Sequence, residues 1–458
     1  MNAQLNKAKV FLIGAGGIGM SALARYFNKQ GKEVGGYDRA ATKLTELLQS
    51  EGIFLTDVNQ ADAIPEAFTN KEDTLVIYTP AIPKQNPIRA FFEAQGFRLF
   101  KRAEVLGLLS KDLQTIAVAG THGKTTTSAM IAFLLKSVKT PINAFLGGIS
   151  TDFGSNLMLE ENAEIMVTEA DEFDRSFLQL EPDVAVVTSL DVDHLDVYAD
   201  REDMLATYRQ FCSQLREDGS LVCKSSIASE LNWSHSIDGF TYGINDPYAF
   251  YSAEKITVVN GTYQFDLRFK DHCIEKLSCG LAGIHNVENA VAALAVCDQL
   301  GLDVAQMRKP LAEFKGVLRR FDVHIKREDF VYIDDYAHHP KEIAVLLQSV
   351  RELYPGKHIT TVFQPHLYSR TRDLGAEFAE SLSETDDLIL LELYPAREEP
   401  IEGIDSRWLG SQTTLKDVPV CNKAQLMDEL KERRMEVLLT VGAGDIDTLV
   451  PTIHTYYQ

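Results

Sequence analysis

The sequence lacks the features of secreted, zinc-finger and membrane proteins. Its 458 residues include only six cysteines, and these form no Cys-x-x-Cys pair and no His pairing at zinc spacing. No segment approaches the roughly 18 consecutive apolar residues that a membrane-spanning helix needs. We therefore expect reduced, mostly buried thiols in a cytoplasmic protein that has no membrane partner.

We do not expect a secretory signal peptide either, although the N-terminus imitates one. Lys7 and Lys9 precede an apolar run from Val10, and the small residues at 21–24 resemble a cleavage site. Glycines interrupt this run, however, and an amphipathic helix is predicted to continue to Gln30. The sequence predicts a soluble protein that is not exported.

Excess positive charge is the third absence. The chain has 45 lysines and arginines against 66 aspartates and glutamates, a net charge of −21 with a pI near 5.0. This balance argues against nucleic acid or an anionic membrane surface as a partner. It also makes each basic residue inside a motif more informative. The length predicts about three domains, without internal repeats or a low-complexity linker between them.

The most informative segment is a glycine-rich turn between a predicted strand, 116–119, and a predicted helix, 128–135. Its glycines would aim backbone N–H groups at one point, and the start of the helix adds further donors. Lys124 can reach outer phosphates, and the Thr125 hydroxyl can bind Mg²⁺. The spacing is shorter than in a standard P-loop. An ordinary βα turn without a ligand is the alternative interpretation. The phosphate-binding prediction covers the following residues: Gly120, Thr121, His122, Gly123, Lys124, Thr125 and Thr126.

Another glycine-rich turn lies nearer the N-terminus and is the first of the two along the chain. It follows the predicted strand 10–13. It satisfies Gly-x-Gly-x-x-Gly, and Asp38 stands near the distance expected for a ribose-binding acid, after a strand at 34–37. The motif fits a dinucleotide, a UDP-sugar or a helix–strand crossing without ligand. A strand at 75–78 ends beside the same predicted site. The residues assigned to it are Gly14, Gly16, Gly17, Ile18, Gly19, Asp38, Thr79 and Ala81.

Acidic residues cluster after two further predicted strands, 165–168 and 184–188. Four acids occur in the six residues from Glu169 to Asp174, and Asp-x-Asp-His-x-Asp spans 191–196. Such a charge run is usually a solvated turn, but its place beside a phosphate loop favours Mg²⁺ coordination. We predict Thr125, Glu169 and His194 as metal ligands.

Polar residues recur in the C-terminal half. His285 and Asn289 precede a predicted helix at 290–296, and either cap it or hydrogen-bond an adenine edge. Predicted strands at 331–333, 359–363, 388–393 and 437–441 follow. Three of them end in His, Arg, Asp or Gly, as ligand sites of parallel sheets do.

Taken together, these motifs resemble the Mur ligase family over nearly the whole chain. The carriers are, in order, GAGGIGM (14–20), GTHGKTTT (120–127), EADEFDRSF (169–177), DHLDVY (193–198), HNVEN (285–289), Arg319–Phe321, DYAHHP (335–340), QPHLYSRTRDL (364–374) and GAGDI (442–446).

The resemblance implies an α/β fold of three domains. These are an N-terminal Rossmann-like UDP-sugar domain (1–107), a central P-loop-type ATP-binding domain (108–318) and a C-terminal Rossmann-like domain (319–458). It also implies ATP and Mg²⁺ as cofactors. The implied reaction joins L-alanine to the lactyl carboxylate of UDP-N-acetylmuramate through an acyl phosphate. The chain would be a monomer or weak homodimer.

Roles for individual residues follow from the same resemblance. Lys124, Glu169, His194, His338 and Arg370 would be catalytic, while Arg319 or Arg320 would reach ATP phosphates. Further implied contacts are Asp335 to the ribose, His285 and Asn289 to adenine, and His338, His366 and Arg370 to the acceptor carboxylate and alanine, with His366 in the UDP-sugar site.

Two departures from the family pattern bear on substrate contacts. Leu367 stands where the family commonly has arginine, so that Arg370 or Arg372 would have to supply the charge. Thr79-Pro80-Ala81 replaces the more usual Ser-Ser-Ala. Two alternatives stay open at this stage: a related ligase that joins a recycled tripeptide to the same UDP-sugar, and an NAD-dependent dehydrogenase.

Overall fold

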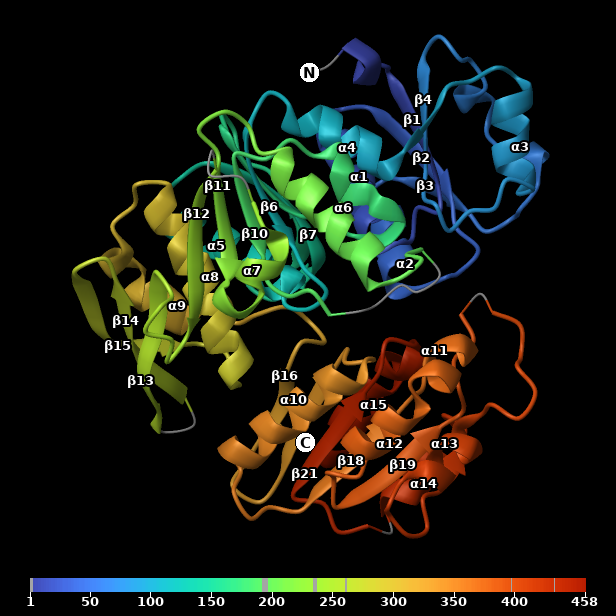
Figure 1. Cartoon of the computed structure of the whole chain (residues 1–458). Helices are drawn as coiled ribbons and strands as arrows, with labels where there is room; N and C mark the ends of the chain where they lie inside the picture. The colour runs from blue at the N-terminus through green and yellow to red at the C-terminus, as the bar shows by residue number, and fades with distance from the viewer. Residues whose placement is uncertain (1–2, 192–196, 234–236, 260–261, 397, 432) are drawn as a thin grey trace. The chain divides into compact units, whose positions relative to one another are not determined.

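The computed structural model describes residues 3–191, 197–233, 237–259, 262–396, 398–431 and 433–458. The chain divides into two compact units. Unit 1 comprises 1–256, 265–278 and 288–315, and unit 2 comprises 257–264, 279–287 and 316–458. Figure 1 shows by its colours that three sheets are built from successive parts of the chain. The predicted α/β class is confirmed. The domain boundaries at 107 and 318 stay predictions.

The first sheet of unit 1 is parallel, with the strand order β3-β2-β1-β4-β5. The order reverses between β1 and β4, which is where such sheets bind ligands. Each strand predicted in this region is present. The elements are β1 (Lys9–Ile13), α1 (Ile18–Lys29), β2 (Glu33–Tyr37), α2 (Lys43–Ser50), β3 (Phe54–Thr56), β4 (Thr74–Tyr78), α3 (Pro87–Ala94), β5 (Leu99–Lys101) and α4 (Arg102–Ser110).

The second sheet has ten strands in the order β15-β14-β13-β12-β11-β10-β6-β9-β7-β8. The strands from β13 to β7 pair in parallel, and β8 pairs with β7 in the antiparallel sense. The strands are β6 (Gln114–Ala119), β7 (Ile142–Ser150), β8 (Ser155–Met158), β9 (Ile165–Glu169), β10 (Val184–Val187), β11 (Ser220–Lys224), β12 (Asp238–Ile244), β13 (Tyr251–Val259), β14 (Thr262–Phe269) and β15 (His272–Cys279). The helices are α5 (Lys124–Ser137), α6 (Arg201–Ser213), α7 (Ala228–Leu231), α8 (Ile284–Gln299) and α9 (Arg308–Glu313).

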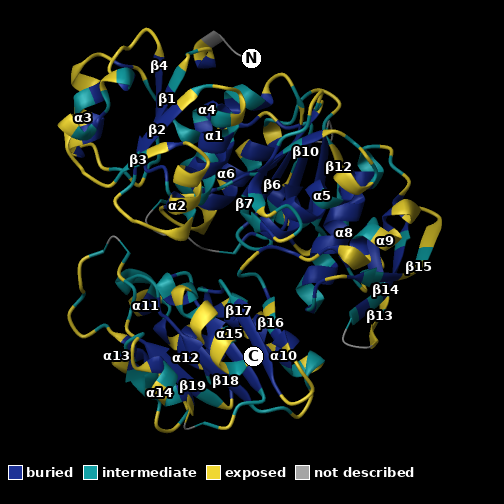
Figure 2. Ribbon diagram, turned by 180° about the vertical axis from the view of Figure 1, so that it is seen from behind, coloured by how far each residue is buried: buried dark blue, intermediate teal, exposed yellow. Residues whose placement is uncertain are grey.

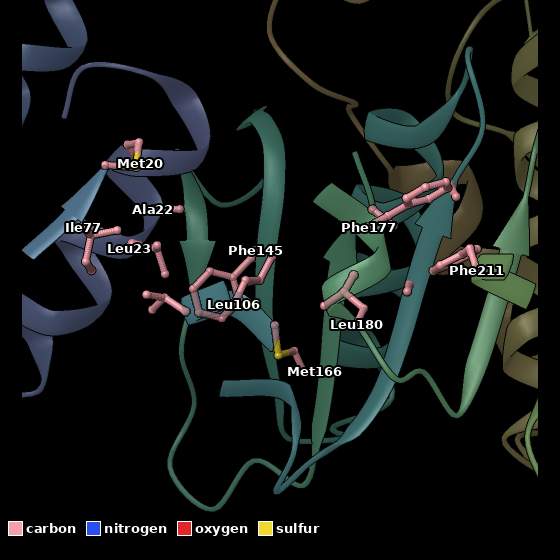
Figure 3. Packing of buried hydrophobic residues seen from close by; sticks show 14 of the residues in the cluster. Met20, Ala22, Leu23, Ile77, Leu106, Phe145, Met166, Phe177, Leu180 and Phe211 are labelled. Atoms are coloured by element: carbon pink, nitrogen blue, oxygen red, sulfur yellow. The ribbon is translucent and has the colours of Figure 1, made fainter. Parts of the chain in front are cut away.

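One apolar core joins these two sheets within unit 1. Met20 and Leu23 of α1 pack in the same cluster as Phe145 of β7 and Met166 of β9 (Figure 3). A fully buried Asn156 on β8 crosses the same contact, since its Nδ2 donates to Ile18 O at 2.6 Å. The helix that follows the first glycine-rich turn is therefore fixed to the central sheet.

The third sheet, in unit 2, has the order β16-β17-β21-β18-β19-β20, with β16 antiparallel to β17. Its central strands are buried on both faces (Figure 2), because α10, α12 and α13 pack on one side and α14 and α15 on the other. The strands are β16 (Asp322–Lys326), β17 (Val331–Asp335), β18 (Ile359–Phe363), β19 (Asp387–Leu391), β20 (Val420–Cys421) and β21 (Val437–Val441). The helices are α10 (Pro340–Leu353), α11 (Tyr368–Asp373), α12 (Gly375–Leu382), α13 (Ser406–Gln412), α14 (Leu426–Lys431) and α15 (Val450–Tyr457).

Two further expectations can be compared with the structure. The six cysteines are free, and all but Cys273 are buried, as predicted. No helix in the described part of the chain combines the length and apolarity that a membrane crossing requires.

Candidate functional site

The second glycine-rich turn of the chain, between β6 and α5, has the conformation of a phosphate-binding turn. Gly120 (φ 127°) and Gly123 (φ 83°) both adopt the left-handed region, which strains any residue with a Cβ. A Cβ on Gly120 would also stand 2.7 Å from the backbone N of Ser189. Helix α5 begins at Lys124 with no acidic residue in its first turn. Its unpaired N–H groups and its dipole therefore favour an anion at this point.

The turn is braced by the segment that follows β10. The backbone N of His122 donates to Ser189 Oγ at 2.7 Å, and Thr121 Oγ1 donates to Asp191 O at 2.7 Å. Thr188 Oγ1 donates to the backbone oxygens of Ala119, at 3.1 Å, and of His122. The conformation of the loop is thus fixed without a ligand, as a preorganised site requires.

Lys124 is held inside this turn. Its Nζ donates to Gly120 O at 2.6 Å and pairs with both carboxylate oxygens of Glu172, at 2.9 and 2.8 Å. Burial alone would lower the pKa of Lys124, but the charges of Glu172, Glu169 and Asp171 outweigh it and raise the pKa. Lys124 therefore stays a cation.

Glu169 ends β9 on the strand next to β6. Its Oε2 is buried and has no hydrogen-bond partner among the residues that the structure describes. Gly147 of β7 makes the room, because a Cβ there would overlap the carboxylate. A buried carboxylate oxygen without a partner costs free energy unless a cation joins it. Glu169 and the Thr125 hydroxyl are the oxygen ligands that Mg²⁺ prefers, so the residues fit this ion.

The third predicted metal ligand cannot be placed. His194 lies outside the described residues, together with 192–196. Within the described ranges, no three His, Cys, Asp or Glu side chains are grouped as a metal site. The three-residue metal site therefore stays a prediction.

The first glycine-rich turn lies at the switch point between β1 and β4. Gly14 (φ 89°) lies close against Thr79, since a Cβ there would stand 2.5 Å from Thr79 Cγ2. Asp38 Oδ2 accepts from the backbone N of Gly16 at 2.7 Å, and its Oδ1 accepts from Ala40 at 3.0 Å. Both oxygens thus stabilise loops, and the predicted ribose contact of Asp38 remains untested.

A cavity of about 210 Å³ connects this turn with the acid-rich loop after β9, within unit 1. Of the predicted residues, Gly17, Ile18, Gly19, Thr79 and Glu169 line it, whereas Ala81 is exposed and does not. Figure 3 shows Met20, Ala22, Leu23, Leu106 and Phe145, which belong to the same lining, side by side. The cavity thus has the N-terminus of α1 at one wall and Glu169 at another.

Arg102 is a functional candidate that the sequence did not reveal. It begins α4, lines the cavity and pairs with Asp171 at 3.4 Å. Its guanidinium lies against Gly19, where a Cβ would stand 2.6 Å from Nη1. In the sequence Arg102 is one of three charged residues before a short predicted helix, with Lys101 and Glu104, and nothing there separates it from its neighbours.

The two adenine candidates behave differently. Helix α8 begins at Ile284, so Asn289 lies inside the helix and cannot cap it, contrary to one interpretation of the sequence. Asn289 Oδ1 instead accepts from Thr127 Oγ1 at 3.2 Å and closely approaches Gly123. In unit 2, burial and the charge of Arg320 lower the pKa of His285 to about 4, so that its imidazole is neutral at pH 7. Contact of either residue with adenine stays a prediction.

In unit 2, the paired arginines are distinguished by their partners. Arg319 pairs with buried Asp334 at 3.2 Å and also donates to Gly442 O. Both guanidinium groups lie over the ring of Tyr336, that of Arg319 at 5.1 Å and that of Arg320 at 5.0 Å from its centre. Since Arg319 is engaged by an acid and a backbone carbonyl, Arg320 is the better candidate for a phosphate contact.

Asp335 is engaged by backbone N–H groups. Its Oδ2 accepts from Phe321 at 2.6 Å and its Oδ1 accepts from Ala337 at 2.7 Å. Burial raises the pKa of Asp335 to about 6 despite Arg320. The ribose role of Asp335 stays a prediction.

The predicted acceptor residues meet at the carboxyl ends of β17 and β18. The ring centres of His338 and His366 are 6.3 Å apart, and His366 stacks on Tyr394 at 5.8 Å. His338 Nδ1 lies 3.6 Å from Glu342. Arg370 lies on α11, which begins directly after Leu367. The histidines are thus brought together, whereas the role of Arg370 stays a prediction.

These features define a class of enzyme that joins two anionic ligands. One sheet has a glycine-rich turn at a Rossmann-type switch point, the next carries a P-loop-type turn, and the buried acid Glu169 lines the cavity beside the first turn.

The chain belongs to the Mur ligase family. Three family models match it in order: the Mur ligase family catalytic domain over 9–113, the Mur ligase middle domain over 118–297, and the Mur ligase glutamate ligase domain over 319–446. The chain is 46% identical over 444 residues to a UDP-N-acetylmuramate–L-alanine ligase of Christiangramia forsetii, covering 96% of each chain. It is also 46% identical over 444 residues to the enzyme of the same name from Parabacteroides distasonis, covering 97% of this chain and 96% of that one.

Solved structures show the same fold. UDP-N-acetylmuramate-alanine ligase MurC from Thermotoga maritima is similar with a TM-score of 0.83 and 28% identity, covering 98% of this chain and 99% of that one. A murein peptide ligase from Psychrobacter arcticus has a TM-score of 0.72 at 20% identity, with 98% of each chain covered. The second likeness concerns the fold alone.

Proposed function

We propose that this chain joins L-alanine to the lactyl carboxylate of UDP-N-acetylmuramate, with conversion of ATP to ADP and phosphate, in the synthesis of peptidoglycan precursors in the cytoplasm. The observation that carries this function is the cavity of unit 1, which has the N-terminus of α1 and Arg102 on one side and Glu169 on the other. It would offer a sugar nucleotide an anion site, and Glu169, at the end of the strand that pairs with the P-loop strand, would lie toward the acceptor end. The names of the curated relatives agree with this assignment.

The chemistry explains why both sites are needed. A carboxylate is a poor electrophile, so transfer of the γ-phosphoryl group to it gives an acyl phosphate whose phosphate can leave. The alanine amine then attacks the acyl carbon, and the amide forms as phosphate departs. Lys124 would hold the outer phosphates of ATP, and Arg102 would neutralise the diphosphate of the sugar nucleotide. The contribution of the protein is mainly positioning and charge neutralisation.

Mg²⁺ would be held by Thr125 and Glu169, and by His194. When bound, it neutralises charge on the transferred phosphoryl group. Glu169 is positioned for this by Gly147, which leaves room for its carboxylate, and by its place at the end of β9 next to the P-loop strand.

Residues of unit 2 would supply the remaining contacts. Arg320 would contact ATP phosphates and Asp335 the ribose, while neutral His285 would hydrogen-bond adenine. His338, His366 and Arg370 would gather the acceptor carboxylate and the amino acid. Asp335 must be ionised to accept from a ribose hydroxyl with full charge, and its raised pKa of about 6 allows that at neutral pH.

A phosphate-release assay across amino acids tests the proposal. Release should require both UDP-N-acetylmuramate and an amino acid, with L-alanine preferred over glycine, L-serine and the tripeptide L-Ala-γ-D-Glu-meso-diaminopimelate. Equal or better turnover with the tripeptide would identify the recycling ligase instead. The dehydrogenase alternative predicts reduction of NAD by the same protein, and it explains neither Lys124 nor Glu169.

Two substitutions separate the sites. Lys124→Ala and Glu169→Ala should abolish turnover and leave UDP-sugar binding nearly intact in a calorimetric titration. A large loss of UDP-sugar affinity in Lys124→Ala would show that the two sites are misplaced.

A further inference from the structure

All the donors of the P-loop lysine are already used inside the protein. Lys124 Nζ lies 2.6 Å from Gly120 O, 3.3 Å from Thr121 O and 2.8–2.9 Å from the Glu172 carboxylate. An ammonium group has three N–H donors. Lys124 can bind an outer phosphate of ATP only if one of these contacts is given up.

Glu172 is the contact that a phosphate can replace. Its side chain is 3% exposed, and a carboxylate presents to an ammonium the same kind of anionic oxygen that a phosphate does. The two carbonyl oxygens belong to the loop itself, where Gly120 and Thr121 are fixed by the braces from Ser189 and Asp191. Of the three contacts of Lys124 Nζ, the contact with Glu172 is therefore the one that a competing anion replaces most easily.

The backbone that carries Glu172 is anchored. Its carbonyl oxygen accepts from Tyr198 Oη at 2.7 Å and from the backbone N of Arg175 at 3.0 Å. Arg175 is itself tied to Asp203 at 2.7 Å, and the chain passes through the left-handed region at Asp174 and Arg175. The exchange of partners must therefore occur by rotation of the Glu172 side chain, with the loop in place.

We propose that Glu172 is a placeholder counter-ion, which pairs with Lys124 in the nucleotide-free enzyme and is exchanged for the outer phosphates when ATP binds. Glu172 keeps the buried ammonium of Lys124 charged and in position. It also competes with anions that bind Lys124 more weakly than the outer phosphates of ATP do. It is a positioning residue, since it acts through Lys124. This inference rests on the proposed role of Lys124 in ATP binding and goes beyond it.

Glu172 could act as a placeholder for phosphate or as a structural support for Lys124. The two roles predict changes of opposite sign in nucleotide affinity when Glu172 is replaced. If Glu172 competes with phosphate, Glu172→Gln removes the competitor and the repulsion, and nucleotide binding becomes tighter. If Glu172 props Lys124 in its phosphate-holding position, the same change weakens nucleotide binding. Asp171→Asn is the matched control, because it removes the adjacent charge, which pairs with Arg102 in the cavity instead.

The experiment is a calorimetric titration of the full chain with Mg²⁺ and ADP, and with Mg²⁺ and a non-hydrolysable ATP analogue. We expect Glu172→Gln to lower both dissociation constants about tenfold, on the scale of a close like-charge contact relieved. Asp171→Asn should change them less than about threefold. AMP, which has no outer phosphate, should bind wild type and Glu172→Gln equally.

Unchanged or weaker binding of ADP and the analogue to a folded Glu172→Gln would overturn the exchange. An equal gain in nucleotide affinity in Asp171→Asn would also overturn the exchange. The effect would then come from the total negative charge near the turn and not from the contact of Glu172 with Lys124. If Glu172→Gln does not fold, Glu172→Asp is the test. Because its carboxylate is one methylene shorter and reaches Lys124 less well, this variant should still bind ADP more tightly than wild type. Equal or weaker binding refutes the proposal. If wild type itself binds no ADP, the proposed function fails, independently of Glu172.

Discussion

Gly147 should control the position of the carboxylate on which the proposed metal site depends. A Cβ on this residue would stand 2.5 Å from Glu169 Oε1 and closer still to Oε2, whereas real Cβ contacts essentially never fall below 3.0 Å. Gly147→Ala therefore forces Glu169 to move by about 1 Å. A displacement of that size in a catalytic site lowers turnover about 100-fold, which corresponds to ~2.7 kcal/mol.

Stability should respond differently. Gly147 lies in β7 and does not have a positive φ, so that alanine suits its backbone. Glycine inside a strand is destabilising by about 0.5–1 kcal/mol relative to alanine. We expect the substitution to leave the free energy of unfolding within about 1 kcal/mol of wild type, because this gain offsets the local crowding.

The assay combines phosphate release with denaturant unfolding, and a second substitution serves as the control. Glu169→Asp retracts the carboxylate by one methylene, so the double variant Gly147→Ala/Glu169→Asp should recover part of the turnover that Gly147→Ala loses. Full activity in Gly147→Ala would refute the assigned role of Glu169. Parallel loss of activity and stability would show instead that the residue is only structural.

Three other predictions address the rest of the molecule. Arg102→Gln should raise the dissociation constant for UDP-N-acetylmuramate about tenfold in calorimetry while leaving that for ADP unchanged. Asn156→Leu should lower the free energy of unfolding by about 2–3 kcal/mol in urea, because Leu can neither donate to Ile18 O nor accept from Arg25 Nη1. His285 has a folded pKa of about 4, below its unfolded value of about 6.5. The unfolded chain thus binds more protons between these values, and the stability lost on acidification from pH 6.5 to 4 should shrink in His285→Gln, measured by unfolding at each pH.

The sheet strands near the motifs could be predicted because their signals are local. Val331, Ile359 and Val437 begin short runs rich in β-branched and apolar residues, and the structure places strands at all three. The start of α8 could not be predicted. His, Asn and Val at 285–287 have modest helix propensity, and the Ala-rich segment after them looked like the true start. In the structure α8 begins at Ile284, so Asn289 lies inside that helix, from where its Oδ1 accepts from Thr127 Oγ1 of α5.

Contacts between residues that are far apart along the chain could not be predicted from the sequence. The acid that holds Lys124 is 48 residues away, and Asn156 meets Ile18 across 138 residues. Residue types restrict such partners only to a class, since any acid of the chain can pair with a lysine. The choice is made by strand order, which places β9 beside β6.

The acid-rich loop after β9 shows what the structure adds to a motif. From sequence, four acids in six residues were either a solvated turn or metal ligands, and neither interpretation describes them all. Three of the acids pair with cations of unit 1: Asp171 with Arg102, Glu172 with Lys124, and Asp174 with Lys101.

Glu169 alone keeps a buried oxygen without a hydrogen-bond partner or cation in the described part of this loop. The loop is therefore divided between one carboxylate that is available to a metal ion and three that hold cations in place. In a chain of net charge −21, cations that bind phosphate must be protected from other acids. If Lys124 and Arg102 bind phosphates as proposed, their pairing with neighbouring acids of one anchored loop keeps both charged and oriented until the anionic substrates arrive.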